Sequence, residues 1–410
     1  AISDLSARAI LDSRGNPTVE VDCFVDGQLQ GRAAVPSGAS TGSYEAIELR
    51  DGGDHWVGKG VASAVANVNG EIRDALIGMN VADQQGIDTA LVALDGTENK
   101  ARLGANAMLG VSMACLRASS QGALWKHIAG EGPSSIPVPQ MNILNGGAHA
   151  ASNVDIQEFM AVPHGFDSFS DALRAGVEIY HSLKSVLKEE GLLGGIGDEG
   201  GFAPNLPRNE DGLRLVLSAI SAAGYSPGEQ VSIALDCAAQ EFCHDDGYHI
   251  DGGILSGSEL GQLYSSWLDT YPIVSLEDAF GEDDWEAWSE FTTREGHRVQ
   301  VVGDDLYVTN PTRLSKGIAE GASNAILIKL NQIGTVSETM RVIEMARSAG
   351  FATIISHRSG ETSDHMISDL AVGTNAGQIK TGAPARSDRT AKYNQLIRIS
   401  EQCDNYANLF

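Results

Sequence analysis

Six short apolar segments in the second half of the chain each end on an ionisable residue. The segments read SIALD, IVSLE, QVVGD, AILIK, TIISH and GQIK, and their last residues are Asp236, Glu277, Asp304, Lys329, His357 and Lys380. Each interval between these ends has room for a buried strand, a helix and two loops. Parallel strands covered on both faces are apolar throughout. The pattern therefore predicts a parallel β/α barrel whose mouth carries these six residues.

The segments that precede these repeats supply the missing barrel strands. Strand-like patterns lie near 138–144 and 156–162, and helical periodicity follows near 167–190 and 208–223. With six strand–helix pairs after them, they give the order ββαα(βα)6 and eight strands. We therefore expect an α/β fold with a barrel over residues 131–410.

The first part of the chain has a different pattern. Residues 5–36 alternate between apolar and polar positions and contain turn signals, which predicts a three-stranded meander. From about residue 61 to residue 128 the periodicity is helical. The segment 130–137, GEGPSSIP, has the composition of a linker. The expected arrangement is a smaller N-terminal α+β domain over residues 1–130.

Charge and composition restrict the possible partners. The 410 residues include 54 Asp and Glu against 28 Lys and Arg, a formal net charge of −26 that argues against nucleic acid and anionic membrane surfaces. No apolar segment approaches the roughly 20 residues of a membrane span. Five scattered cysteines indicate free thiols in a reducing compartment, and we expect a cytoplasmic protein. Residues 329–400 are locally richer in Lys and Arg, which suits an anionic small-molecule substrate.

The three acids at the strand ends predict a metal site. Taken alone, each of Asp236, Glu277 and Asp304 is more often a solvated loop residue or a helix cap. On consecutive strands about 4.8 Å apart, however, their carboxylates can share one cation. Oxygen ligands alone favour Mg²⁺ over Zn²⁺.

The two lysines suggest the chemistry. Lys329 and Lys380 can each simply pair with an acid. Near a divalent cation and a second ammonium, however, a lysine is pushed toward its neutral form and becomes a usable base. Proton abstraction next to a carboxylate, with metal holding the extra charge, is the reaction class that uses this combination.

Two glycine-rich segments add candidate loops. The segment 194–205 matches GxGxxG, but no strand-to-helix context is expected there, and Asp198 and Glu199 fill the place of a pyrophosphate. It is more plausibly a loop that delivers a carboxyl group. The segment from Pro36 to Glu45 is either a surface turn or a lid over the site, and composition leaves both open.

Long motifs in a fixed order identify a family resemblance. They include ILDSRGNPTVEV, AAVPSGASTG, GDEGGFAPN, KLNQIGT, SHRSGET and GQIKTGAPARSDR. Over essentially its whole length the chain resembles the enolase family. These enzymes are magnesium-dependent lyases of glycolysis and gluconeogenesis that interconvert 2-phospho-D-glycerate and phosphoenolpyruvate. Enolase-superfamily sites with a Lys or His base and Mg²⁺ are a known chemical pattern.

The resemblance implies a role for each motif residue. Lys329 is the implied base at C2, and Glu199 is the implied acid for the C3 hydroxyl. Asp236, Glu277 and Asp304 are implied ligands of a first Mg²⁺, and Ser40 of a second Mg²⁺ that arrives with substrate. The residues implied to bind substrate are His149, Glu158, His357, Arg358, Ser359 and Lys380.

The resemblance also implies a homodimer or a larger assembly of dimers. Two alternatives remain at this stage. One is an acid-sugar dehydratase of the same superfamily, although its KxK strand or His–Asp dyad is not found at the expected strands. The other is a binding protein without catalysis.

Overall fold

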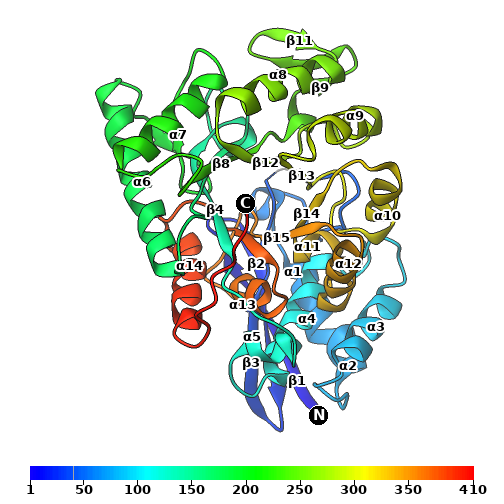
Figure 1. The fold of residues 1–410 in the computed structure, drawn as a ribbon. Helices are drawn as coiled ribbons and strands as arrows, with labels where there is room; N and C mark the ends of the chain where they lie inside the picture. The colour runs from blue at the N-terminus through cyan, green and yellow to red at the C-terminus, as the bar shows by residue number, and fades with distance from the viewer. Residues whose placement is uncertain (40) are drawn as a thin grey trace.

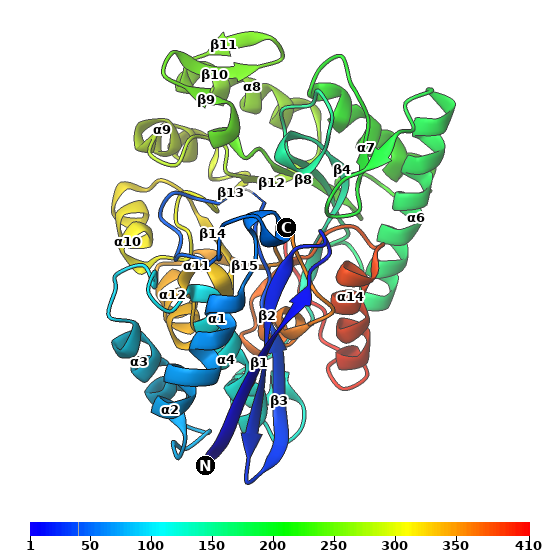
Figure 2. The same cartoon turned by 180° about the vertical axis from the view of Figure 1, so that it is seen from behind.

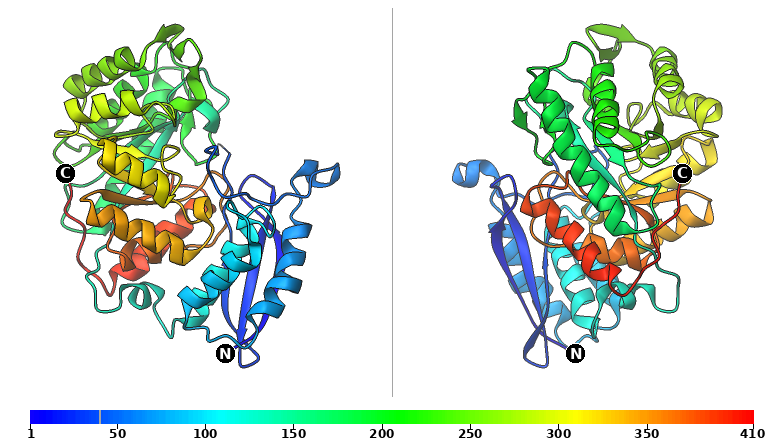
Figure 3. Two further views of the ribbon diagram at one scale, coloured as in Figure 1. Left: turned by 90° about the vertical axis from the view of Figure 1, so that its right-hand side faces the viewer. Right: turned by 60° about the vertical axis from the view of Figure 1, so that its left-hand side comes forward.

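The computed structural model describes residues 1–39 and 41–410. The chain folds into a small sheet with helices, and a larger barrel ringed by helices (Figure 1). Figure 3 separates these two parts, with the N-terminal part in blue and the barrel in green to red. Among the described residues, none of the helices has both the length and the apolar character that crossing a bilayer requires.

The N-terminal sheet confirms the predicted meander. Its strands are β1 (Ile2–Leu11), β2 (Pro17–Val25) and β3 (Gln28–Ala34), paired antiparallel in that order. Figure 2 brings this sheet forward. Helix α4 (Ala105–Ser119) packs against β2 and β3, and its residues 105–116 are all buried. Small side chains allow that close packing, since a Cβ at Gly110 would meet Val21 at 2.7 Å.

The other N-terminal helices complete this part. They are α1 (Ala62–Asn67), α2 (Arg73–Leu76), α3 (Gln84–Asp95) and α5 (Leu124–Ala129). Asp83 caps α3 by accepting a hydrogen bond from the Gly86 backbone N–H, which satisfies one of the donors that a helix start leaves unpaired.

The barrel has the predicted order of elements. Its strands are β4 (Val138–Asn145), β5 (Glu158–Val162), β8 (Ser232–Asp236), β12 (Ile273–Glu277), β13 (Gln300–Gly303), β14 (Ala325–Ile328), β15 (Ala352–Ser356) and β16 (Gly377–Lys380). Pairing of β16 with β4 closes the sheet. The outer helices are α6 (Phe169–Glu189), α7 (Glu210–Ala222), α8 (Gly257–Thr270), α9 (Trp285–Glu295), α10 (Pro311–Glu320), α12 (Val336–Ser348), α13 (Met366–Gly373) and α14 (Ser387–Ser400).

One strand differs from the predicted all-parallel barrel. Strand β5 runs antiparallel to both β4 and β8. A parallel return needs a crossover, usually through a helix, whereas the segment 146–157 contains only the short turn Gly147–His149. The reversal places Glu158, the first residue of β5, opposite Asp236, the last residue of β8. Glu158 therefore lies at the same mouth as the strand-end acids.

The strand ends are aligned by register. Glu277 pairs with Asp236 across β12 and β8, and Lys380 pairs with Ser356 across β16 and β15. Asp304, Lys329 and His357 each directly follow the last residue of a strand. This confirms that the six ionisable ends meet at one face of the barrel.

A partly buried ion pair ties the N-terminal helix α4 to the barrel. Arg117 on α4 donates to both carboxylate oxygens of Asp364, at 2.5 and 2.7 Å. Asp364 also accepts from the Ala34 and Met366 backbone N–H groups. Burial disfavours the carboxylate, but the charge and hydrogen bonds of Arg117, together with the two backbone N–H donors, outweigh it and hold the pKa of Asp364 below its usual range.

We expect Asp364→Asn to lower the free energy of unfolding at pH 7 by about 1–3 kcal/mol, because it removes the charged partner of a partly buried guanidinium. The folded-state pKa of Asp364 is depressed, so the wild-type pair stabilises the fold above about pH 4 and loses this effect as pH falls through the folded pKa. Urea titrations of both proteins at pH 7 and in acid measure the loss of unfolding free energy and its dependence on pH. Asp4→Asn, in the exposed pair with Arg73, is the control and costs less than about 1 kcal/mol. Equal losses in the two variants would contradict the assignment.

Candidate active site

The candidate residues that the structure describes gather at the barrel mouth. One small cavity is lined by several of them, namely His149, Glu158, Glu199, Asp236, Lys329, His357, Arg358, Ser359 and Lys380. Glu277 and Asp304 adjoin it through contacts with Lys380 and Lys329. Ser40 lies outside the described residues.

Lys380 holds the first group of carboxylates together. Its Nζ lies 2.9 Å from Asp236 Oδ2, 2.9 Å from both Glu277 oxygens and 3.2 Å from Glu158 Oε1. These residues come from four strands, and the register described above brings them level. A single ammonium thus faces three buried carboxylates.

The pKa directions show that this group carries excess negative charge. Burial and the nearby Asp236 charge hold the pKa of Glu277 well above its usual range. Burial and Glu199 raise the pKa of Glu158 to about 7. Burial would lower the pKa of Lys380, but the surrounding carboxylates outweigh it and raise that pKa. One ammonium is too little charge for these acids, so a further cation would stabilise them.

Lys329 forms the second charged contact. Its Nζ donates to Asp304 Oδ2 at 2.5 Å, and the amide of Gln332 donates to Asp304 Oδ1 at 2.8 Å. Burial favours the neutral amine, and Arg358 and Lys380 act in the same direction, but the nearby carboxylates, Asp304 before Glu277, together outweigh them and raise the pKa of Lys329. This arrangement therefore favours the charged amine. The neutral lysine that the sequence predicts beside a divalent cation stays a prediction.

The donor set of the mouth fits a divalent cation. Asp236, Glu277 and Asp304 offer only carboxylate oxygens, which hard cations prefer. In the described residues, two groups of acid or His side chains bring their ligand atoms within 4.8 Å of one another: His149, Glu158 and Glu199, and Asp278, Asp304 and Asp305. The expected trio is not one of these groups. Instead, Lys380 bridges Asp236 and Glu277, while Asp304 holds Lys329.

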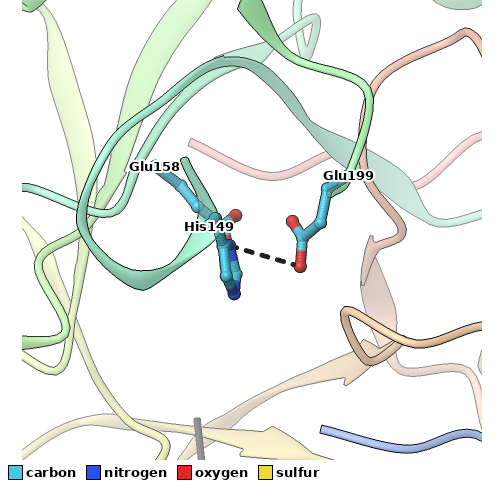
Figure 4. Close-up of side chains that lie close together, drawn as sticks. All are labelled: His149, Glu158 and Glu199. Carbon is cyan, nitrogen blue, oxygen red and sulfur yellow. Dashed lines mark ion pairs between the residues drawn. The ribbon is translucent and has the colours of Figure 1, made fainter. Parts of the chain in front are cut away.

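A separate cluster surrounds Glu199 (Figure 4). His149 Nδ1 lies 3.3 Å from Glu158 Oε1 and 3.5 Å from Glu199 Oε1. On its other side, Glu199 Oε2 accepts a hydrogen bond from Asn142 Nδ2 at 2.9 Å and lies 3.3 Å from His357 Nε2. Burial would raise the pKa of Glu199, but His357, His149 and Arg389 outweigh it and hold this pKa well below its usual range. This environment therefore favours the ionised form of Glu199.

The glycine-rich loop places Glu199 by close backbone approach. The two-residue strands β6 (Gly195–Ile196) and β7 (Phe202–Ala203) form a hairpin. In the described segment between β7 and α7, no other helix begins. A Cβ at Gly197 or Gly201 would lie 2.7 or 2.3 Å from the Asn145 side chain. Gly197 and Gly201 thus allow close packing against Asn145, and the segment forms a hairpin without the strand-to-helix turn of a pyrophosphate-binding loop.

The segment from Pro36 to Glu45 contacts the mouth. Ser37 and Gly360 exchange two backbone hydrogen bonds of 2.8 Å, and the Ala39 N–H donates to Ser359 Oγ at 2.6 Å. Arg358 donates to both Glu45 oxygens, at 3.0 and 3.1 Å. The sequence left open whether this segment is a surface turn or a lid. These contacts of Ser37, Ala39 and Glu45 favour a segment that covers the site.

Comparisons with known proteins agree along the whole chain. Residues 2–128 match the family model described as "Enolase, N-terminal domain", and residues 133–409 match "Enolase, C-terminal TIM barrel domain". The chain belongs to the enolase family. It is 56% identical to the enolase of Acidothermus cellulolyticus over 409 residues, which is 99% of this chain and 95% of that one. It is also 56% identical to the enolase of Natranaerobius thermophilus, over 98% of this chain and 95% of that relative.

Family membership makes this chain a lyase with a small-molecule substrate. Enolase-family relatives imply a divalent metal, and the carboxylates at the barrel mouth are able to bind one. The family resemblance drawn from the sequence motifs is therefore confirmed. The predicted barrel is confirmed as well, except that β5 is reversed.

Four residues at this enolase-type mouth were missed by sequence reasoning. Asn142 donates to Glu199, and Glu45 pairs with Arg358. Asp278 accepts the backbone N–H groups of Asp304 and Asp305, each at 2.8 Å, and so fixes the loop after β13. Arg389 touches His357. The sequence offered a reason to examine two of them, because Asp278 directly follows Glu277 and Arg389 lies in the motif GQIKTGAPARSDR. Asn142 lies within a buried strand, and nothing in its sequence context indicates a role at the mouth.

Proposed function

We propose that the protein catalyses the reversible, Mg²⁺-dependent dehydration of 2-phospho-D-glycerate to phosphoenolpyruvate. Lys329 is the base that takes the C2 proton, and Glu199 is the acid that protonates the departing C3 hydroxyl. The observation that carries the proposal is that a largely buried lysine and a buried glutamate lie at one mouth that also holds an acid cluster. Membership of the enolase family agrees with it.

The strand order supports separate positions for base and acid. Lys329 follows β14 and contacts Asp304. Glu199 lies on the loop whose strand β7 pairs with β4, beyond β15 and β16 in the sheet. A small substrate between them can lose a proton to one residue and a hydroxyl to the other. Glu199 is buried and Lys329 is largely buried, which limits the access of water to the two groups.

Asp304 connects the metal to the base. Asp304 is a proposed metal ligand, together with Asp236 and Glu277, and it is also the group that keeps Lys329 protonated. If a cation engaged Asp304, the attraction of this carboxylate for Lys329 would weaken, and burial, Arg358 and Lys380 would favour the neutral amine. Bound Mg²⁺ would also balance the charge that develops on the substrate carboxylate after loss of the C2 proton.

The remaining mouth residues are proposed to hold the substrate. Arg358 and Ser359 would bind the phosphate, because a guanidinium offers two parallel donors to such a group. Lys380 would bind the carboxylate, with His149, Glu158 and His357 around the C3 hydroxyl. An anionic substrate raises the pKa of Glu199 by repulsion and so favours the protonated acid that the reaction needs. Ser40, outside the described residues, is proposed to join a second Mg²⁺.

The test is formation of phosphoenolpyruvate from 2-phospho-D-glycerate, followed by ultraviolet absorbance with and without a chelator. We expect turnover with Mg²⁺, complete loss with the chelator, and recovery when excess Mg²⁺ is returned. A control with chelator that has first been saturated with Mg²⁺ shows whether the chelator itself affects the enzyme. Turnover that persists without divalent metal would contradict the proposal.

Three further points are proposed. The family resemblance suggests a homodimer or a larger assembly of dimers, and the scattered cysteines suggest a cytoplasmic location. The linker-like composition of 130–137 suggests a domain boundary after residue 130. The end of α5 at Ala129 and the gap between the two family matches, from 128 to 133, support that boundary.

A further inference from the structure

Arg389, near the start of α14, is fully buried between two loops of the mouth. It donates to Nδ1 of His357 at 2.6 Å and to the backbone oxygens of Arg358 and Ser359, each at 2.5 Å. A further N–H donates to the Asp198 backbone oxygen at 3.1 Å. Arg389 thus joins the loop that carries Glu199 to the loop that follows β15.

The guanidinium determines where His357 carries its proton. An arginine side chain has five donors, no acceptor, and stays protonated at all ordinary pH values. The imidazole nitrogen that faces it must therefore accept, because a proton on Nδ1 would point at another N–H. The ring is left neutral, with its single proton on Nε2. Asp388 Oδ2, 2.8 Å from Arg389 Nε, balances the buried charge of the guanidinium.

That Nε2 proton faces Glu199. His357 Nε2 lies 3.3 Å from Glu199 Oε2, within reach although not yet aligned as a hydrogen bond among the described atoms. Such contacts commonly tighten when substrate binds. Burial lowers the pKa of His357 to about 3, so the ring stays neutral near pH 7. A donor at this position stabilises the carboxylate that forms when Glu199 gives up its proton.

We propose that Arg389 is a positioning residue that holds His357 as the neutral Nε2–H tautomer and aims that proton at Glu199. The proposal rests on the proposed function, in which Glu199 is the acid. Arg389 acts through His357 on the loss of the C3 hydroxyl. It does not act on proton removal at C2, because none of its hydrogen bonds described above reaches Lys329.

The kinetic test compares Arg389→Met, Arg389→Lys and Arg398→Met. Arg398 lies on the same helix, is exposed, and hydrogen-bonds to Gln395. We expect Arg389→Met to reduce kcat for dehydration by about 10²–10³-fold, the scale of losing one preorganised donor. Exchange of the C2 proton should stay within about tenfold of wild type, since removal of a proton by Lys329 is a separate step. Arg389→Lys, which keeps a charged donor, should recover part of kcat, and Arg398→Met should match wild type.

A double-mutant cycle separates this role from a structural one. In a His357→Ala background, Arg389→Met should cost less than about threefold, because the residue through which it acts is already absent. Equal costs in both backgrounds, or equal losses of exchange and dehydration, would overturn the proposal. Circular dichroism of each variant shows whether it folds.

The tautomer itself is measured by ¹⁵N NMR of histidine-labelled protein, with His357→Ala used to assign the signal. In the wild type we expect an unprotonated Nδ1 and a protonated Nε2, and in Arg389→Met a mixture of both tautomers. A proton on Nδ1 of wild-type His357 would overturn the proposal. This measurement needs no substrate, so it still decides the Arg389–His357 relation if 2-phospho-D-glycerate is not turned over, a result that would count against the proposed function alone.

Discussion

Lys329→Ala is expected to abolish exchange of the C2 proton of 2-phospho-D-glycerate with solvent, and dehydration with it. Lys329 is the largely buried amine held at the mouth by Asp304, and alanine leaves no group there to take the proton. Loss of a general base typically costs 10²–10⁴-fold, and we expect about the upper end here. Proton NMR in D₂O measures the exchange, and absorbance measures the product.

Two controls accompany this variant. Lys316→Ala removes a lysine from the exposed face of α10, 3.9 Å from Glu320, and should leave both rates unchanged. Lys329→Met keeps much of the side-chain volume, which separates loss of the base from loss of packing. Alanine also leaves the Asp304 carboxylate buried without its ammonium, so thermal unfolding of each variant is compared. Exchange at the wild-type rate in Lys329→Ala would exclude Lys329 as the base.

Glu199→Gln is expected to separate the two half-reactions. Glutamine retains the shape and one acceptor oxygen for Asn142, but it does not supply a proton to the leaving hydroxyl. Dehydration should fall by about 10²–10⁴-fold. Exchange at C2 should remain within about tenfold of wild type, because Lys329 performs that step.

Glu189→Gln, at the exposed end of α6, is the matched control and should leave both rates unchanged. Measurement of both reactions on the same preparation removes differences in the active fraction. Should exchange and dehydration fall together in Glu199→Gln, Glu199 would no longer be assigned as an acid alone.

Much of the barrel mouth could be predicted from the sequence because its geometry is repetitive. Each parallel strand is buried on both faces, so its apolar run ends where it reaches the mouth, and residues such as Asp236 and Lys329 mark that end. The position of Glu158 could not be obtained in this way. It begins its strand, and only the reversal of β5 places it opposite Asp236.

The contacts between loops were also beyond sequence reasoning. Glu45 lies far from Arg358 in the chain, and their ion pair depends on how the covering segment lies against the loop after β15. Arg389 reaches His357 only because α14 returns its first turn to the mouth. Periodicity gives the face on which a side chain lies, but it does not give the partner that the side chain meets from another loop.

The Glu45–Arg358 pair makes phosphate binding an exchange of anions. Under the proposed role of Arg358, an arriving phosphate takes the place of a carboxylate that already occupies the guanidinium. The phosphate contribution to the measured substrate affinity is then the difference in free energy between the Arg358–phosphate pair and the Arg358–Glu45 pair. Between turnovers, Glu45 balances the charge of the buried Arg358. The substrate then binds less tightly, because its phosphate must displace this carboxylate.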